Sequence, residues 1–391
     1  MLEIEKFIQE HKKENWLELL TQKPYCLKYN EDEDYVLLKY DMINSDFTQE
    51  IVKECRGLII DKHTLIPKAL SFFKFFNIQE PLHDEIDWRS ARTQEKVDGA
   101  KILLWFNTYK NKWQISTSGM LDSFKAPIND IGETFGDLFV EALKNINLTL
   151  DEFFTAFKPT YCYTFELVSP KARIVVPYKE TKLYFIGLRD VGTFVELDPD
   201  IEEDVIKLGI PRPKQYPLTN LDECLRATEK MGFDEEGFVV VDRNWHRVKI
   251  KSKDYVLVHF TRFNAGTSYS RILEMIENKT DESFLKIYPE YTKTFDEVRE
   301  KYNNFKGKIK QGINNIKDNL GDIDKLERKI VANYILQTNK DISAFLFRYI
   351  DTKIEDVDLF IDEEWRKLTK NKKLKYLGYK EEKDADKFRE E

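Results

Sequence analysis

The sequence predicts an α+β fold in which a region of antiparallel sheets with helices is followed by an all-helical region. Before about residue 258, short segments rich in β-branched and aromatic residues alternate with charged turns, which is typical of strands and hairpins. From about residue 255 onward, apolar residues recur at helical spacing between charges, and Gly and Pro become scarce. We therefore divide the chain into residues 1–258 and 259–391.

Hairpins dominate the first part of the β-rich region. Strands are expected within 25–40 and 58–76, and the charged residues 61–64 between two apolar runs predict a hairpin tip. A second hairpin is predicted over 102–118, turning near 107–111. Both hairpins are antiparallel by construction.

The middle of the chain mixes helices and strands. Residues 122–158 show helical spacing, with one apolar face made by Phe135, Leu138, Phe139 and Leu143. Further strands are expected at 161–168, 174–176, 182–189, 237–242 and 247–250. Short helices are expected at 200–208 and 221–231. This order gives an α+β pattern rather than regular βαβ units.

Composition limits the classes of function. The net charge of -8 has the wrong sign for a general nucleic-acid coat, so a nucleic-acid enzyme would need a local basic patch. The four cysteines are far apart and the five histidines form no cluster, which argues against a zinc site. Residues 1–20 interleave Glu and Lys with apolar residues, as in an amphipathic helix and unlike a signal peptide. We expect a soluble, cytoplasmic protein with no membrane segment.

The most informative segment surrounds Lys96, in the sequence Glu-Lys-Val-Asp-Gly-Ala-Lys that starts at Glu95. A lysine amine attacks phosphorus only when it is unprotonated, and a free lysine has a pKa of about 10.4. A nucleophilic lysine therefore needs cationic neighbours or burial to lower its pKa. We predict Lys96 to be such a nucleophile.

Strand alternation predicts where the cations lie. In the run Val-Lys-Ile-Lys that starts at Val248, Lys249 and Lys251 share one face while the two apolar side chains enter the core. Glu166 lies on a strand face otherwise made of small residues, which suits contact with a ribose hydroxyl. Glu236 precedes an apolar strand and offers the single carboxylate that Mg²⁺ often takes beside phosphate oxygens.

Two upstream segments complete the set. One runs Glu-Cys-Arg-Gly-Leu-Ile-Ile and contains Arg56, and the other runs Phe-Phe-Lys-Phe-Phe-Asn and contains Lys74. Counted as one, they form five ordered motifs with the segment around Lys96, Phe-Glu-Leu-Val-Ser-Pro around Glu166, Glu-Glu-Gly around Glu236 and the final lysine strand. Together they resemble the covalent nucleotidyltransferases, and specifically the RNA ligase 1 type found in tailed phages, over roughly residues 50–258.

The resemblance implies a nucleotidyltransferase (ATP-grasp-like ligase) domain over 1–258 and a helical C-terminal domain over 259–391 that selects RNA substrate. The resemblance also implies that Lys96 forms a lysyl-AMP, that Asp98 and Gly99 shape its turn, and that Glu95 lies close to the adenine. The implied nucleotide contacts are Arg56, Lys74, Glu95, Glu166, Glu236, Lys249 and Lys251. Lys249 and Lys251 would also be catalytic at the α-phosphate, and Glu236 would bind the metal. The family pattern often has Asn where this chain has Lys171-Ala172 before Arg173, which leaves that loop unassigned.

The implied activity is ATP-dependent joining of 5′-phosphate and 3′-hydroxyl RNA ends, with ATP as AMP donor and Mg²⁺, or Mn²⁺ in its place. The expected partners are RNA ends, with nicked tRNA among them, and we expect a monomer in the cytoplasm, or the host cytoplasm if the source is viral. Two alternatives stay open: a tRNA-splicing-type ligase that requires a 2′-phosphate, and a non-catalytic RNA- or nucleotide-binding relic. In the helical region, the lysine patches 306–310 and 372–375 have two open interpretations. They contact the RNA substrate, or they are the ordinary solvated lysines of a helical brace.

Overall fold

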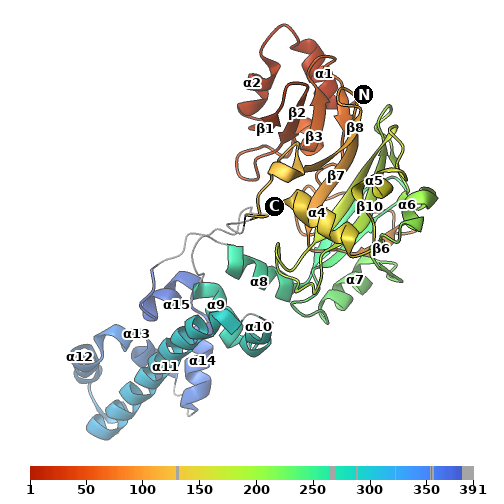
Figure 1. The fold of residues 1–391 in the computed structure, drawn as a ribbon. Helices are drawn as coiled ribbons and strands as arrows, with labels where there is room; N and C mark the ends of the chain where they lie inside the picture. The colour runs from red at the N-terminus through yellow and green to blue at the C-terminus, as the bar shows by residue number, and fades with distance from the viewer. Residues whose placement is uncertain are drawn as a thin grey trace. The chain divides into compact units, whose positions relative to one another are not determined.

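The computed structural model describes residues 1–128, 132–263, 269–287, 289–321, 323–352, 354 and 356–380 (Figure 1). It contains two compact units, Met1–His259 and a unit that begins at Phe260. The first unit combines helices with antiparallel sheets, and the described part of the second is helical. The predicted α+β class is confirmed.

The N-terminal segment forms two short helices, α1 (Glu3–Glu10) and α2 (Trp16–Thr21), where the sequence suggested one. Asn15 starts the second helix because its side chain accepts a hydrogen bond from the Glu18 amide at 3.3 Å. A four-stranded sheet follows in the order β1-β2-β3-β4, with α3 (Glu50–Glu54) between β2 and β3. Its strands are β1 (Lys28–Glu31), β2 (Tyr35–Lys39), β3 (Arg56–Asp61) and β4 (Pro67–Ala69).

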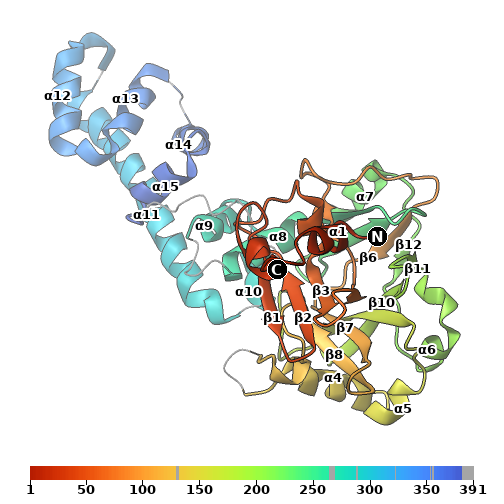
Figure 2. The same cartoon turned by 90° about the horizontal axis from the view of Figure 1, so that it is seen from above.

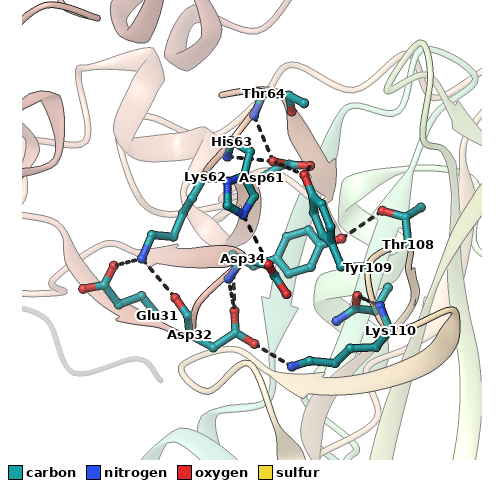
Figure 3. A network of polar contacts seen from close by, with 12 residues as sticks. Glu31, Asp32, Asp34, Asp61, Lys62, His63, Thr64, Thr108, Tyr109 and Lys110 are labelled. Carbon is teal, nitrogen blue, oxygen red and sulfur yellow. Dashed lines mark hydrogen bonds and ion pairs between the residues drawn. The ribbon is translucent and has the colours of Figure 1, made fainter.

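Both predicted hairpin turns are confirmed, and polar contacts join them (Figure 3). Asp61 at the first tip accepts hydrogen bonds from the amides of His63 and Thr64 at 2.8 and 2.9 Å. The hydroxyl of Tyr109, in the second turn, donates to the same carboxylate at 3.0 Å. Burial and the Asp61 carboxylate raise the pKa of Tyr109 to about 12. The network therefore fixes the first sheet against the second.

The second sheet has the order β11-β10-β9-β7-β8, and the third has the order β12-β6-β13-β14-β5. The second contains β7 (Ala100–Asn107), β8 (Lys112–Thr117), β9 (Tyr161–Val168), β10 (Lys182–Asp190) and β11 (Glu196–Leu197). The third contains β5 (Phe76–Asn77), β6 (Arg92–Glu95), β12 (Gln215–Tyr216), β13 (Gly237–Val241) and β14 (Arg247–Lys251). All pairs are antiparallel except β14 with β5.

After α3, the first unit contains the helices α4 (Phe135–Lys144), α5 (Leu150–Phe154), α6 (Glu203–Lys207) and α7 (Leu221–Thr228). Short 3-10 turns occur at Ser123–Lys125, Pro199–Ile201, Pro289–Tyr291, Ile323–Lys325 and Lys340–Ile342. The predicted apolar face of α4 is confirmed, because Leu138 and Phe139 join the buried cluster that contains Phe165 of β9 and Phe185 of β10. This packing covers one face of the second sheet.

The strand predicted at 174–176 is wrong, since this apolar run forms bends. The amides of Val175 and Val176 each donate to a carboxylate oxygen of Asp98, both at 2.8 Å. A side chain has replaced the sheet ladder as their hydrogen-bond partner, so the segment is held near the turn that contains Asp98 instead of within a sheet.

Helix α8 (Lys253–Phe263) starts in the first unit. The second unit contains α9 (Tyr269–Glu277), α10 (Asp281–Ile287), α11 (Thr292–Leu320), α12 (Arg328–Thr338), α13 (Ser343–Thr352), α14 (Val357–Arg366) and α15 (Lys370–Tyr376). Its core forms on the long helix α11, where α13, α14 and α15 lie around it (Figure 2). In the described residues, no helix is both long and apolar enough to cross a membrane.

Candidate active site

Lys96 lies between two strands of different sheets, because β6 ends at Glu95 and β7 begins at Ala100. Its amide donates to the Gly237 carbonyl at 2.9 Å, which holds the lysine beside the start of β13. Its Nζ lies 2.8 Å from Oε2 of Glu236, and 19% of its side chain is exposed. The amine is thus restrained but still reachable from outside.

Glu236 joins two lysines at the start of the same strand. Its Oε1 lies 3.2 Å from Nζ of Lys251, and β13 and β14 are in a register that places Gly237 opposite Lys251. Burial acts to raise the pKa of Glu236, but the ammonium groups of Lys96 and Lys251 outweigh it and hold the pKa below its ordinary value. The site therefore holds a charged carboxylate at neutral pH. Glu235, by contrast, is exposed.

Two glycines permit the close backbone approach that this arrangement needs. A Cβ on Gly99 would lie 2.5 Å from the Leu167 carbonyl oxygen of β9, and one on Gly237 would lie 2.1 Å from that of Ile250. Gly237 also has a φ of +134°, which residues with a side chain rarely adopt. The backbone near Lys96 therefore requires glycine at position 99, and the backbone next to Glu236 requires glycine at position 237.

Asp98 connects the lysine turn to two distant segments. Besides the amides of Val175 and Val176, its carboxylate accepts a hydrogen bond from the Tyr255 hydroxyl at 2.7 Å. Its own amide donates to the Tyr178 hydroxyl at 3.1 Å. Burial and then the nearby Glu236 charge raise the pKa of Asp98. This supports the predicted role of Asp98 in shaping the turn.

The cationic wall of the site includes Arg56, Lys249 and Lys251. Val248 and Ile250 are in the core, as the alternation predicts. The Arg56 guanidinium and the Lys249 ammonium both lie over the Phe75 ring, at 4.9 and 5.3 Å from its centroid. The Arg56 Nη1 atom is buried and has no hydrogen-bond partner among the described residues. A buried guanidinium donor without a partner fits a phosphate ligand.

Glu166 lies on β9 opposite Lys101 of β7. Burial raises its pKa to about 7, with Lys96 opposing the rise and Glu236 adding to it. The effect of both charges places Glu166 within the electrostatic field of the Lys96–Glu236 pair.

The structure places the other two predicted nucleotide contacts less directly. Lys74 is buried, and its Nζ lies over the rings of Tyr40, Phe47 and Phe76 at 5.7, 5.4 and 5.2 Å. Glu95 accepts a hydrogen bond from the Lys214 amide at 3.4 Å. Their nucleotide contacts stay predictions.

Sequence reasoning missed three residues of the site. Phe75 was not assigned although it is within a quoted motif, and Tyr255 lies beyond the last motif, so no local signal marked it. Lys101 follows Lys96 by five positions. Strand alternation on β7 was the signal that could have placed its side chain at the site. Its Nζ donates to the Arg56 carbonyl, and burial followed by the charges of Arg56 and Lys39 holds its pKa well below the ordinary value.

Glu236 is the residue of this site suited to a divalent cation. In the part of the chain that the structure describes, no three His, Cys, Asp or Glu side chains converge as a metal-binding group. One charged carboxylate fits Mg²⁺, which keeps several waters and takes further oxygens from substrate phosphates.

A model of the RNA ligase family matches residues 54–255, which include all the site residues that the sequence predicts. The chain belongs to the RNA ligase family, whose members are enzymes. The predicted resemblance to the phage type is confirmed by relatives from two viruses. An RNA ligase of Rhodothermus phage RM378 is 26% identical over 350 residues, covering 72% of this chain and 76% of the relative.

A candidate bifunctional polynucleotide kinase/RNA ligase of Autographa californica nuclear polyhedrosis virus is 28% identical over 288 residues, covering 67% of this chain and 39% of the relative. Among solved structures, an archaeal ATP-dependent RNA ligase aligns with a TM-score of 0.44 and 14% identity, over 75% of this chain and 80% of that one. A mutant Naegleria gruberi RNA ligase with ATP and Mn aligns with a TM-score of 0.33 and 12% identity, over 44% of this chain and 52% of that one.

Proposed function

We propose that this chain is an ATP-dependent RNA ligase that joins 5′-phosphate and 3′-hydroxyl RNA ends through a lysyl-AMP on Lys96. The observation that supports this most is the buried carboxylate of Glu236 between Lys96 and Lys251, at 2.8 and 3.2 Å. Arg56 adds a buried donor with no partner among the described residues. A lysine held beside further cationic side chains is what nucleotidyl transfer requires.

In the first step, the neutral amine of Lys96 attacks the α-phosphorus of ATP. The P–N bond forms as the bond to the bridging oxygen breaks, pyrophosphate leaves, and the amine loses a proton. Lys249 and Lys251 stabilise the negative charge that develops on the α-phosphate, and Arg56 binds a phosphate oxygen. Glu166 binds a ribose hydroxyl, Glu95 lies near the adenine, and Lys74 contacts the nucleotide.

The next two steps use the same cations. A 5′-phosphate oxygen of RNA attacks the α-phosphorus, the P–N bond breaks, and Lys96 regains its proton. The 3′-hydroxyl of the other end then attacks the 5′-phosphorus, loses its proton, and AMP leaves. Each step is an in-line displacement, so positioning supplies much of the acceleration.

Glu236 would hold Mg²⁺ or Mn²⁺, directly or through its waters. A bound divalent cation supplies charge neutralisation on the phosphate oxygens. Before that, Glu236 holds the Lys96 ammonium in place.

Repair of cleaved RNA, with nicked tRNA as one substrate, is the physiological role that we propose, by a monomer in the cytoplasm of the cell or host. A requirement for a 2′-phosphate at the junction is the main alternative, and sealing assays on ends with and without that phosphate separate the two. A binding relic would have lost a residue of the lysine–glutamate cluster, whereas Lys96, Glu236 and Lys251 are in contact here.

The deciding experiment is incubation with α-labelled ATP and Mg²⁺, followed by denaturing electrophoresis. The wild type should retain label and Lys96→Arg should retain none, because an arginine keeps the charge without a nucleophilic amine. Lys112→Ala, at an exposed position of β8, is the matched control and should label normally. Absence of label on wild-type protein that is free of pre-bound AMP, with GTP tested in parallel, would overturn the proposal.

A further inference from the structure

The helical unit contains a cavity of about 810 Å³ that no part of the proposed chemistry uses. Basic side chains from three helices line it, including Lys308 of α11, Arg348 of α13, and Lys372 and Lys375 of α15. The two lysine patches of the sequence are about 60 positions apart, and this cavity is where the fold brings members of both together. Pockets of about 300–1,000 Å³ accommodate small ligands, so one nucleotide or more fits here.

Ion pairing leaves part of the positive charge of this cavity uncompensated. Both acidic lining residues form ion pairs with basic lining residues, Asp341 with Lys308 and Glu364 with Arg348. Lys372 and Lys375 are exposed and have no ion-pair or hydrogen-bond partner among the described residues. Two ammonium groups three positions apart on α15 are therefore available to an anionic ligand.

The rest of the first lysine patch does not contribute. Lys306 pairs with Asp362 at 2.6 Å and Lys310 with Asp358 at 2.5 Å, and neither lysine lines the cavity. The patch is therefore divided between ordinary surface ion pairs and a single side chain, Lys308, at the cavity.

The floor of the cavity is aromatic. Phe305 and Tyr376 both line it, and their ring centroids are 5.0 Å apart. Phe305 is buried against Trp365 and Phe345, while Tyr376 is half-buried. Cations over an aromatic surface bind single-stranded nucleic acid, because phosphates contact the charges and bases lie against the rings. An acidic peptide would use the charges but not the rings.

We propose that this cavity binds a single-stranded segment of the RNA substrate, with Lys372 and Lys375 on its phosphates and Tyr376 against a base. The proposal rests on the proposed function, because it makes the helical unit the substrate-selecting part of an RNA ligase.

The test measures binding of fluorescein-labelled oligouridylate to the full chain as a function of salt. Lys372→Gln/Lys375→Gln should weaken binding roughly tenfold at low salt and reduce the slope of log affinity against log salt by roughly 1.4, since each single-strand phosphate contact contributes about 0.7. The matched control is Lys293→Gln/Lys329→Gln, which removes two exposed charges of the same unit outside the cavity and should leave the slope unchanged.

Two further measurements separate the possible failures. Lys96 adenylylation needs no RNA, so α-labelled ATP should label the cavity variant as strongly as the wild type. Absence of label on the wild type would instead refute the proposed function. Lysine acetylation of the wild type, read by mass spectrometry, should show RNA-dependent protection of Lys372 and Lys375, which requires no variant to fold. Unchanged binding by the cavity variant, no protection, or equal competition by polyglutamate would each overturn the proposal of an RNA site.

Discussion

The side chains of Asp98 and Tyr255 meet in a buried hydrogen bond of 2.7 Å although they are 157 positions apart. Tyr255→Phe removes the donor and leaves the carboxylate with its two amide partners. We expect the free energy of unfolding to fall by about 1–3 kcal/mol, which is the usual cost of a lost partner at a buried polar group. Adenylylation should slow as well, because Asp98 positions the turn that contains Lys96. Urea unfolding and single-turnover labelling measure the two effects; an unchanged labelling rate would show that Tyr255 serves stability alone.

Gly99→Ala tests the close approach between the lysine turn and β9. The added methyl would lie 2.5 Å from the Leu167 carbonyl oxygen, so the turn must move and carry Lys96 with it. We expect a destabilisation of about 1–3 kcal/mol, as for overpacking elsewhere, and a large loss of labelling. Gly119→Ala is the matched control, since its nearest neighbour is the Lys39 Cδ at 3.9 Å. Equal behaviour of the two variants would contradict the steric argument.

Glu166 predicts a specific pH dependence of stability. Its pKa is about 7 in the folded chain against an ordinary value of 4.5, so folding takes up a proton between these pH values. The free energy of unfolding therefore decreases as pH rises from about 4.5 to about 7 and gains no further change from this group above that range. Glu166→Gln should lose this component. Denaturant unfolding of both proteins at several pH values measures the difference, and parallel curves would contradict the raised pKa.

Lys101 should show a conflict between stability and activity. Its pKa in the folded chain is held well below the ordinary value, mainly by burial. Folding therefore releases a proton at pH values between the folded and the ordinary pKa, and burial of this amine lowers the free energy of unfolding at neutral pH. Lys101→Met keeps the length of the side chain and removes that cost, and we expect a more stable protein by thermal unfolding. The variant also loses the hydrogen bond to the Arg56 carbonyl, so the KM for ATP in adenylylation should rise. A variant with lower thermal stability and an unchanged KM for ATP would contradict both expectations.

Periodicity made part of the site predictable. Alternation on β14 determines that Lys249 and Lys251 share a face, and the adjacent glycine identifies Glu236 as the residue directly before β13. Tyr255 could not be found in this way, because nothing local relates it to Asp98. The run 174–176 was misread because its apolar residues suit a strand, whereas the Asp98 carboxylate that binds its amides is about 77 positions away. The cavity of the helical unit likewise depends on tertiary packing of α15 against α11.

The two compact units predict a division of labour that a truncation can test. The contact between Tyr255 and Asp98 requires α8, which extends to Phe263, so a fragment of residues 1–263 preserves the helix where a cut at residue 258 would divide it. We expect this fragment to form lysyl-AMP at a rate close to that of the full chain, because the Lys96 cluster lies wholly within it. Sealing of RNA should fall, since the cavity lined by Lys372 and Lys375 is absent. A fragment that folds, as judged by cooperative unfolding, yet takes no AMP would show that adenylylation itself depends on the helical unit.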